Sequence, residues 1–439
     1  MNTSMEYEFS NECIKENLNL FEEPLTQKEI ISNRWVEYIP QQSISRDGLI
    51  NFSINSSGDE FIDMKSSYII MSIKISKYGD IDIDAIDKYI PVNNFLHSII
   101  SKVDVTYNNT LVATDHMNYH YRAYLQTLLN FNRDTHNTLL SSCLWYKDSV
   151  GGFETVSKNG NPSGWKRFER IKPILKRGYV NVGGRLFIDL FSQNQLIPNG
   201  VNIGVNLTLQ DVNYPFISIR DMEFEIRNVS LFARKITLSN VIQSQIENDW
   251  ITKPMVYPFV RSKVQSFPIV ENHLHIHRDN LFTGQLPSKI IIGFVETSAF
   301  MKTDTTKNPF YFQPFNVNYL TIYKNDKMIP SKPFTPNFDN DDFIRSYFSI
   351  FDVTNKYYES ESLDINIQEY KDGYTLWGFN LTSDSCGDNF FNEPETGNIK
   401  LEIKFKEALT NSITVIVYAD FHNKLLIENT REIIPKYIL

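Results

Sequence analysis

The stretch Val103-Asp104-Val105-Thr106-Tyr107-Asn108-Asn109 decides the fold of this chain. Apolar and polar side chains alternate along its first five residues, which is typical of a strand with one buried and one solvated face. The two asparagines predict a tight turn, and a short second strand follows from Leu111. A helical stretch carrying Arg122-Ala123-Tyr124-Leu125 comes next. The chain therefore contains a unit in the order strand, turn, strand and helix.

The second half of the chain repeats this order. A strand ending Thr321-Ile322-Tyr323 leads into the turn Lys324-Asn325-Asp326, and a strand through Met328 follows. The next helical stretch carries Arg345-Ser346-Tyr347-Phe348. Each half also ends with an alternating strand and then a long strand, at 201–209 and 224–236 in the first half and at 399–405 and 413–427 in the second. The spacings differ by several residues, so the repeat is one of architecture in which the loops vary.

Length and composition fit a large β protein. The chain has 439 residues, of which 13% are aromatic, with only 18 glycines and 18 prolines. These values exclude a collagen-like, low-complexity or disordered chain, and the abundant Phe, Tyr, Val and Ile favour pleated, half-buried surfaces. Strict alternation recurs at Ile50, Phe52 and Ile54, at Met71, Ile73 and Ile75, and at Ile399, Leu401, Ile403 and Phe405.

We therefore predict an all-β chain of two tandem antiparallel jelly rolls, each a β-sandwich, with short helical insertions. The best helical signals are at 119–131, 239–250 and 340–351. The predicted organisation is an acidic N-terminal arm at 1–33, a first jelly roll at 34–238, a linker at 239–256, and a second jelly roll with a C-terminal extension at 257–439. The arm holds seven Glu against two Lys.

Several function classes lack their sequence signals. The N-terminus is acidic and has no apolar core of a signal peptide, and no apolar run approaches the ~18 residues of a membrane span. Three scattered cysteines give neither a disulfide framework nor zinc-ligand spacing. The nucleophile elbow, the P-loop, the H-E-x-x-H motif and the Rossmann fingerprint are absent from the sequence. We expect no enzymatic activity and no cofactor.

A series of short motifs follows a fixed order along both halves. In the first half these are Pro91-Val92-Asn93-Asn94-Phe95-Leu96-His97-Ser98, Val103-Asp104-Val105, Tyr119-His120-Tyr121-Arg122-Ala123-Tyr124-Leu125 and Leu128-Leu129. In the second half they are Gly284-Gln285-Leu286-Pro287, Ile291-Ile292-Gly293, Asn308-Pro309-Phe310-Tyr311-Phe312, Tyr374-x-Leu376 and Phe379-Asn380-Leu381-Thr382. From about Trp35 to about Ile427, the chain thus resembles the double jelly-roll major capsid protein of Polinton (Maverick) elements and adintovirus-like viruses.

The resemblance implies a structural function. Three copies would form a homotrimeric, pseudo-hexagonal capsomer with six jelly rolls around one axis, and such capsomers would tile an icosahedral viral or virus-like shell. A separate penton protein would fill the vertices, and minor capsid proteins would be further partners. The protein would lie in the virion capsid after assembly inside the host cell. A trimer of tandem domains also suits a hexagonal lattice on physical grounds, because it presents six similar wedges.

Two other classes are compatible with a jelly roll. The first is a receptor- or glycan-binding spike or lectin-like module, which would need no second, architecturally matched domain. The second is a cupin-type enzyme, which needs His and carboxylate ligands that converge inside a barrel. His97, His116 and His120 form a local cluster, but no carboxylate spacing matches them. The capsid protein is therefore the preferred hypothesis.

One basic cluster stands out in a chain of net charge -9. Its seven cations are Lys158, Lys166, Arg167, Arg170, Lys172, Lys176 and Arg177, and Glu169 is the single acid among them. Such a local charge reversal predicts weak contact with packaged DNA or with an acidic partner, such as the N-terminal arm of a neighbour. A solvated loop that pairs with nearby acids is an equally good interpretation.

The candidate metal ligands are His273, His275 and His277. At strand spacing their imidazoles would lie on one face, close enough to share a zinc or copper ion. The alternatives are an exposed strand face and a subunit contact that titrates near pH 6.5. We prefer these alternatives to a metal site, so we predict that the protein binds no metal.

The two helical stretches carry matching arginine–tyrosine pairs, Arg122 with Tyr124 and Arg345 with Tyr347. We expect these pairs to brace the strands against which the helices pack. A buried and paired arginine is worth much to stability, whereas an exposed one is worth little.

Overall fold

The computed structural model describes residues 18, 20, 23, 26–44, 49–55, 58–77, 89–172, 178–357, 359–383 and 391–437. Most of the predicted acidic arm therefore lies outside the described residues. Lys176 and Arg177 of the basic cluster also lie outside them.

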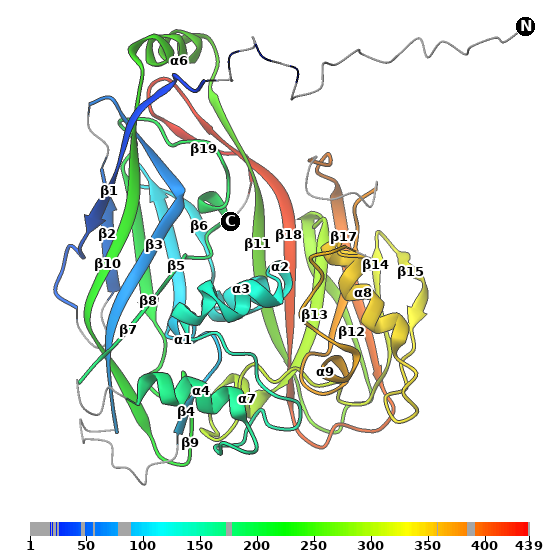
Figure 1. Ribbon diagram of the computed structural model, residues 1–439. Helices are drawn as coiled ribbons and strands as arrows, with labels where there is room; N and C mark the ends of the chain where they lie inside the picture. Colours follow the sequence, from blue (N-terminus) through cyan, green and yellow to red (C-terminus); the bar gives the residue numbers. More distant parts are fainter. Residues whose placement is uncertain are drawn as a thin grey trace, which may run out of the picture.

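The first half forms a sandwich of two four-stranded antiparallel sheets (Figure 1). One sheet has the order β1 (Ile30–Tyr38), β10 (Met222–Leu238), β3 (Glu60–Lys77) and β7 (Val180–Gly184). The other has the order β2 (Leu49–Ile54), β8 (Ile203–Leu209), β5 (Ile100–Tyr107) and β6 (Thr110–Thr114). The short strands β4 (Tyr89–Pro91) and β9 (Phe216–Ser218) pair separately below them.

The second half forms a sandwich of the same kind. One sheet has the order β11 (Met255–Ile269), β18 (Ile413–Ile427), β13 (Lys289–Glu296) and β16 (Leu376–Asn380), and β19 (Ile433–Pro435) pairs with β18. The other has the order β12 (His275–Gln285), β17 (Thr396–Phe405), β14 (Val317–Lys324) and β15 (Lys327–Phe334). The prediction of two antiparallel jelly rolls is confirmed.

The alternating sequences form strands in the predicted register. In β2 the side chains of Ile50, Phe52 and Ile54 are buried and their neighbours are not. The turn pair Asn108–Asn109 has φ values of 46° and 67°, and its counterpart Asn325–Asp326 has values of 50° and 64°. Asn and Asp tolerate this left-handed region better than other side chains, so both halves use the same tight hairpin turn.

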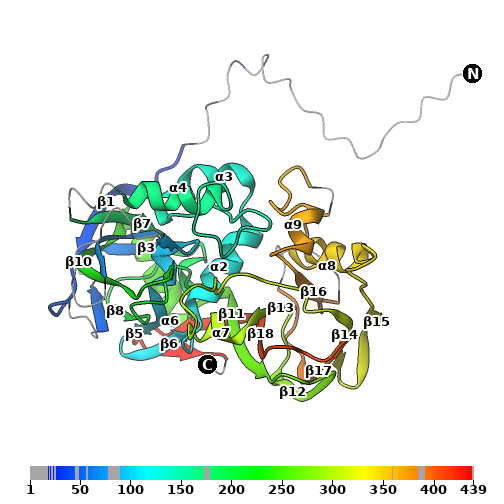
Figure 2. The ribbon, with the colours of Figure 1, turned by 90° about the horizontal axis from the view of Figure 1, so that it is seen from below.

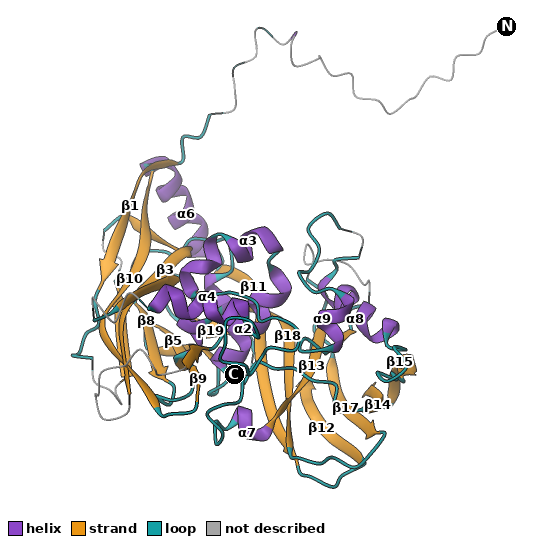
Figure 3. Cartoon of the chain, turned by 60° about the horizontal axis from the view of Figure 1, so that its bottom comes forward, coloured by secondary structure: helices purple, strands orange, loops and turns teal. Residues whose placement is uncertain are grey.

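Helices lie at the ends of the sandwiches and between them (Figure 3). The predicted helices are present as α2 (Tyr119–Asn130), α6 (Asn240–Thr252) and α8 (Ile344–Thr354). Helix α8 begins four residues later than the prediction of 340–351, because Asn337 and Asp342 pair as a β-bridge first. The predicted linker is thus occupied mainly by α6, which is N-capped by the Ser239 side chain.

The two sandwiches stand side by side (Figure 2), and each contributes residues to the other's core. Tyr119 and Ala123 of α2 pack into the first core, whereas Tyr121, Tyr124 and Leu125 of the same helix pack into the second. In return, Tyr257, Phe259, Leu425, Ile427 and Ile433 from β11, β18 and β19 extend into the first core. Burial of this apolar surface stabilises the junction as well as each sandwich.

Candidate functional site: the interdomain junction and the charged surfaces

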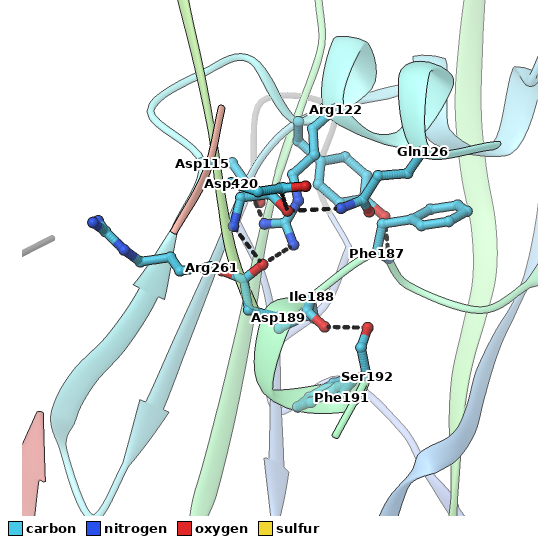
Figure 4. A network of polar contacts seen from close by, with 12 residues as sticks. Asp115, Arg122, Gln126, Phe187, Ile188, Asp189, Phe191, Ser192, Arg261 and Asp420 are labelled. Carbon is cyan, nitrogen blue, oxygen red and sulfur yellow. Dashed lines mark hydrogen bonds and ion pairs between the residues drawn. The ribbon is translucent and has the colours of Figure 1, made fainter. Parts of the chain in front are cut away.

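A buried ion-pair network occupies the junction (Figure 4). Arg122 of α2 is 3% exposed, and its guanidinium contacts Asp115 at 2.6 Å and Asp189 at 2.5 Å. Asp189 begins the short 3-10 helix η3 (Asp189–Phe191) and also accepts the Ser262 amide of β11 at 3.0 Å. One guanidinium therefore joins α2 of the first sandwich to a carboxylate that holds a strand of the second.

Further hydrogen bonds extend this network across the junction. The Gln126 amide nitrogen, one turn along α2, donates to the Ser262 hydroxyl at 2.9 Å and to the Tyr418 hydroxyl at 3.1 Å. Ser262 in turn donates to Asp420 at 2.8 Å. Strands β11 and β18 are thereby tied to one face of α2.

Burial dominates the electrostatics of this network. Burial raises the pKa of Asp189 to about 6, against the opposing effect of the Arg122 guanidinium and the Ser262 amide. Burial also raises the pKa of Asp115, and Arg122 again opposes the shift. Two carboxylates share one guanidinium here, so the network binds a proton more readily than an isolated carboxylate would.

Several motifs behind the capsid-protein resemblance meet at this junction. Phe310 stacks on Tyr124 with ring centroids 4.3 Å apart and planes 6° from parallel. The Tyr121 hydroxyl donates to the Pro309 carbonyl at 2.8 Å. The Asn308 side chain donates to the Phe153 carbonyl at 3.0 Å. These residues therefore position the two sandwiches relative to each other.

Arg345 differs from its counterpart Arg122. It is exposed, its guanidinium donates to the carbonyls of Lys332 and Pro333, and it lies over the Phe334 ring at 5.0 Å. It contacts β15 within the second sandwich, whereas Arg122 spans two sandwiches. The repeated sequence pattern thus forms a contact between the sandwiches in the first half and a contact within one sandwich in the second half.

The helix that carries part of the basic cluster exposes some of its cations and buries another. Helix α4 (Pro162–Ile171) is N-capped by Asn161 and begins with a proline, a favourable start for a helix. Four of the cluster's cations are exposed and form no ion pair within the described part of the chain: Lys158, Lys166, Arg170 and Lys172. Trp165 donates to the Glu169 carboxylate at 2.9 Å on the same helix.

The prediction that the whole cluster faces a partner is wrong for Arg167. Its side chain is fully buried and pairs with Asp148 at 2.6 Å, and its Nε donates to the Pro91 carbonyl at 2.7 Å. Helical spacing explains the error, since Gly164, Arg167 and Ile171 lie on one buried face of α4. Arg167 is a core residue that cannot contact DNA or an acidic partner.

The three candidate metal ligands do not converge. His273 precedes β12 and lies 3.1 Å from the Val270 carbonyl, while His275 contacts Glu402 at 3.2 Å and His277 contacts Asp279 at 3.0 Å. Within the described residues no group of three or more His, Cys, Asp and Glu side chains is arranged to hold a metal ion. The three histidines belong to an exposed surface.

The histidines considered for a cupin site are core residues or turn residues. Burial lowers the pKa of His97 and of His120 to about 3, so both rings are neutral at physiological pH. His97 lies 3.0 Å from the Tyr119 hydroxyl, and His120 packs against Tyr121 and Tyr214. These contacts fill the interior and leave no set of converging ligands among them.

A second interdomain contact was not foreseen from the sequence. His136 of α3 (Arg133–Asn137) lies 3.2 Å from the Asp364 carboxylate, and Lys147 contacts Glu369 of α9 (Ile367–Lys371) at 2.8 Å. The partners are more than 200 residues apart, and no local pattern connects them. Only the N-capping sequence Asn366-x-x-Glu369 carries a local signal, for the start of α9.

Comparison with known proteins identifies the class of fold. No family model matches the sequence. The uncharacterized protein F54H12.2 of Caenorhabditis elegans is 24% identical over 416 residues, which cover 91% of this chain and 96% of that protein.

Viral structures are among the solved structures with a similar architecture. A chain of the Sputnik virophage structure superposes with a TM-score of 0.62 at 12% identity, covering 98% of this chain and 94% of that one. The Faustovirus major capsid protein gives 0.57 at 8%, with 93% and 92% covered, and the mavirus major capsid protein gives 0.55 at 12%, with 100% and 97% covered. The chain has the double jelly-roll fold of these major capsid proteins over essentially its whole length.

Among the helices that the structure describes, none is long and apolar enough to cross a membrane.

Proposed function

We propose that the protein is the major capsid protein of a Polinton-like element or virus and forms the homotrimeric capsomers of an icosahedral shell. The observation that carries this proposal is the full-length match of both jelly rolls to viral major capsid proteins. A receptor- or glycan-binding module would require only one of the two sandwiches. The nematode relative of nearly equal length supports an element that resides in animal genomes.

The described geometry supports a rigid building block. Two sandwiches whose apolar cores contact each other present their strands side by side, with helices at their ends and between them. Loops at the ends can vary without disturbing either core. We propose 239–256 as the division between the two jelly rolls, the virion as the location, and penton and minor capsid proteins as further partners. No catalytic role is proposed.

Negative-stain imaging of the purified full-length chain tests this function. Particles with a pseudo-hexagonal outline of six similar lobes are expected, because each of three copies contributes two jelly rolls. Particles that show only two lobes at every protein concentration would contradict the proposal. Assembly of larger shells upon co-expression with a penton protein would extend it.

The exposed cations on and beside α4 form the proposed contact with packaged DNA or another polyanion. Double substitution Lys166→Glu and Arg170→Glu should weaken binding to duplex DNA and reduce its salt dependence by about one unit of slope per lost phosphate contact. The matched control is Lys327→Glu with Lys332→Glu, two exposed lysines of the second jelly roll. Equal binding by both variants would remove α4 from this role.

A further inference from the structure

A second basic surface lies on the second jelly roll, apart from α4. It is a groove of about 950 Å³ between β11, β12, β18 and the C-terminal segment. Its cations are Arg261, Lys263, Lys424 and Lys436, and the single carboxylate in its lining is Glu393. Such an excess of positive charge contrasts with the net charge of -9 of the chain.

In the part of the chain that the structure describes, the lysines of this groove lack acidic partners. Within the described residues Lys263, Lys424 and Lys436 form no ion pair. Burial and the neighbouring Arg261 guanidinium lower the pKa of Lys263, as expected of a cation without a compensating carboxylate. Phe282, Phe391 and Phe421 line the same groove, so it offers apolar contacts between the charges.

An apolar groove leads from the root of the N-terminal arm to this basic groove. It measures about 770 Å³ and is lined by Ile30, Leu238, Ile246 and Trp250, among others. Ile30 begins β1, where the arm joins the body. Val256, which is 49% exposed, lines both grooves, so the two grooves adjoin at this residue.

The arm has the composition that these two grooves require. Leu18 and Leu20 are 65% and 76% exposed, so they lack the apolar cover that the first groove provides. Closer to the N-terminus in sequence, the arm reads Glu6-Tyr7-Glu8-Phe9, which alternates carboxylates with aromatic rings. The roughly 20 residues between Glu8 and Ile30 span up to ~70 Å when extended, which is ample for this path.

We propose that the acidic N-terminal arm folds back along its own chain, with its leucines in the apolar groove and Glu6 and Glu8 in the basic groove. The arm of the same chain is favoured because its root lies at the entrance, and a tether gives it a high effective concentration. Arm docking does not require a capsid role, so the two proposals are tested separately.

Zero-length carbodiimide cross-linking of the full-length protein tests this docking, with the products mapped by mass spectrometry. Isopeptide bonds are expected between Glu6 or Glu8 and Lys263, Lys424 or Lys436. In a mixture of ¹⁵N-labelled and unlabelled protein, they should join only peptides of the same label. Cross-links between differently labelled peptides would overturn docking within one chain and indicate exchange of arms between copies.

Charge reversal supplies the control. The double variant Lys424→Glu with Lys436→Glu should lower the yield of cross-links to the remaining Lys263 about tenfold, the effect of losing ~1.4 kcal/mol. Adding Glu6→Lys with Glu8→Lys to this variant should restore cross-links to the groove. The control Lys166→Glu on α4 with Lys172→Glu at its C-terminal end should leave the yield unchanged.

Two results would contradict the assignment. The first is a set of arm cross-links that map to α4 instead of the groove. The second is a loss of yield that the compensating arm variants do not restore while near-ultraviolet circular dichroism shows intact folding.

Discussion

Arg122 is the residue on which the junction depends most. Arg122→Ala would leave Asp115 and Asp189 buried without their shared cation, which costs about 3–5 kcal/mol in comparable buried pairs. Chemical denaturation of the full-length chain measures this loss. The matched control is Arg345→Ala, which should cost about 1 kcal/mol or less because Arg345 is exposed and bonds to carbonyls of one strand. Equal losses in the two variants would refute the difference assigned to them.

The buried histidines predict how stability depends on pH. His97 and His120 have folded-state pKa values of about 3, below the ordinary value of 6.5, so the unfolded chain binds their protons first. Their contribution to stability is therefore complete above pH 6.5 and is lost as the pH falls below it. Asp189 acts in the opposite direction between about pH 6 and 3.8, because its folded-state pKa is raised.

Each of the two histidines contributes a loss of about 1.4 kcal/mol per pH unit as the pH falls, and Asp115 and Asp189, whose pKa values are raised, oppose it, so the net slope of stability with pH is smaller than the histidines' share alone. Denaturation midpoints across pH 4–7 measure this slope. The variant His120→Phe keeps an aromatic ring beside Tyr121 and Tyr214 and removes one titrating group. Its pH dependence should be flatter by one histidine's share. An unchanged slope would show that His120 does not titrate on unfolding.

At the scale of elements, α8 lies against β16 at a position that only glycine fits. A Cβ on Gly378 would lie 2.3 Å from the Ser349 carbonyl oxygen. The Gly378 amide donates to the Ser349 hydroxyl at 2.9 Å. Gly378→Ala should therefore destabilise the second jelly roll by about 1–3 kcal/mol. Thermal unfolding checks this cost. Gly58→Ala, where a Cβ meets nothing within 4 Å, should cost only the ~1 kcal/mol of its positive φ.

The strands were predictable because their signal is local. Alternation in β2 and β17 and the paired turns at 108–109 and 325–326 depend on neighbours in sequence. The charged contacts were not predictable in the same way. Asp189 is 67 residues from Arg122, and Asp364 is 228 residues from His136, so only the tertiary fold brings them together. Arg167 was assigned to the surface by composition, although its helical spacing with Gly164 and Ile171 indicated a buried face.

At the scale of the whole molecule, the shared cores predict one cooperative unit. Residues 34–238 expressed alone would expose Tyr124, Leu125 and Trp145, which belong to the second core in the complete chain. This fragment should bind a hydrophobic dye and lack a cooperative thermal transition, because the exposed apolar surface is no longer covered. The full-length chain under the same conditions is the control. A fragment that unfolds cooperatively without dye binding would contradict the shared-core account.

The oligomeric state of the purified protein in solution tests the proposed shell function most directly. Native mass spectrometry of the purified full-length protein should detect a trimer of about 154 kDa, three times the chain mass of 51.2 kDa. The trimer should persist upon dilution to micromolar protein, since capsomers are stable building blocks. A single species of 51.2 kDa across the whole concentration range would contradict the proposal that this chain forms the capsomers of an icosahedral shell.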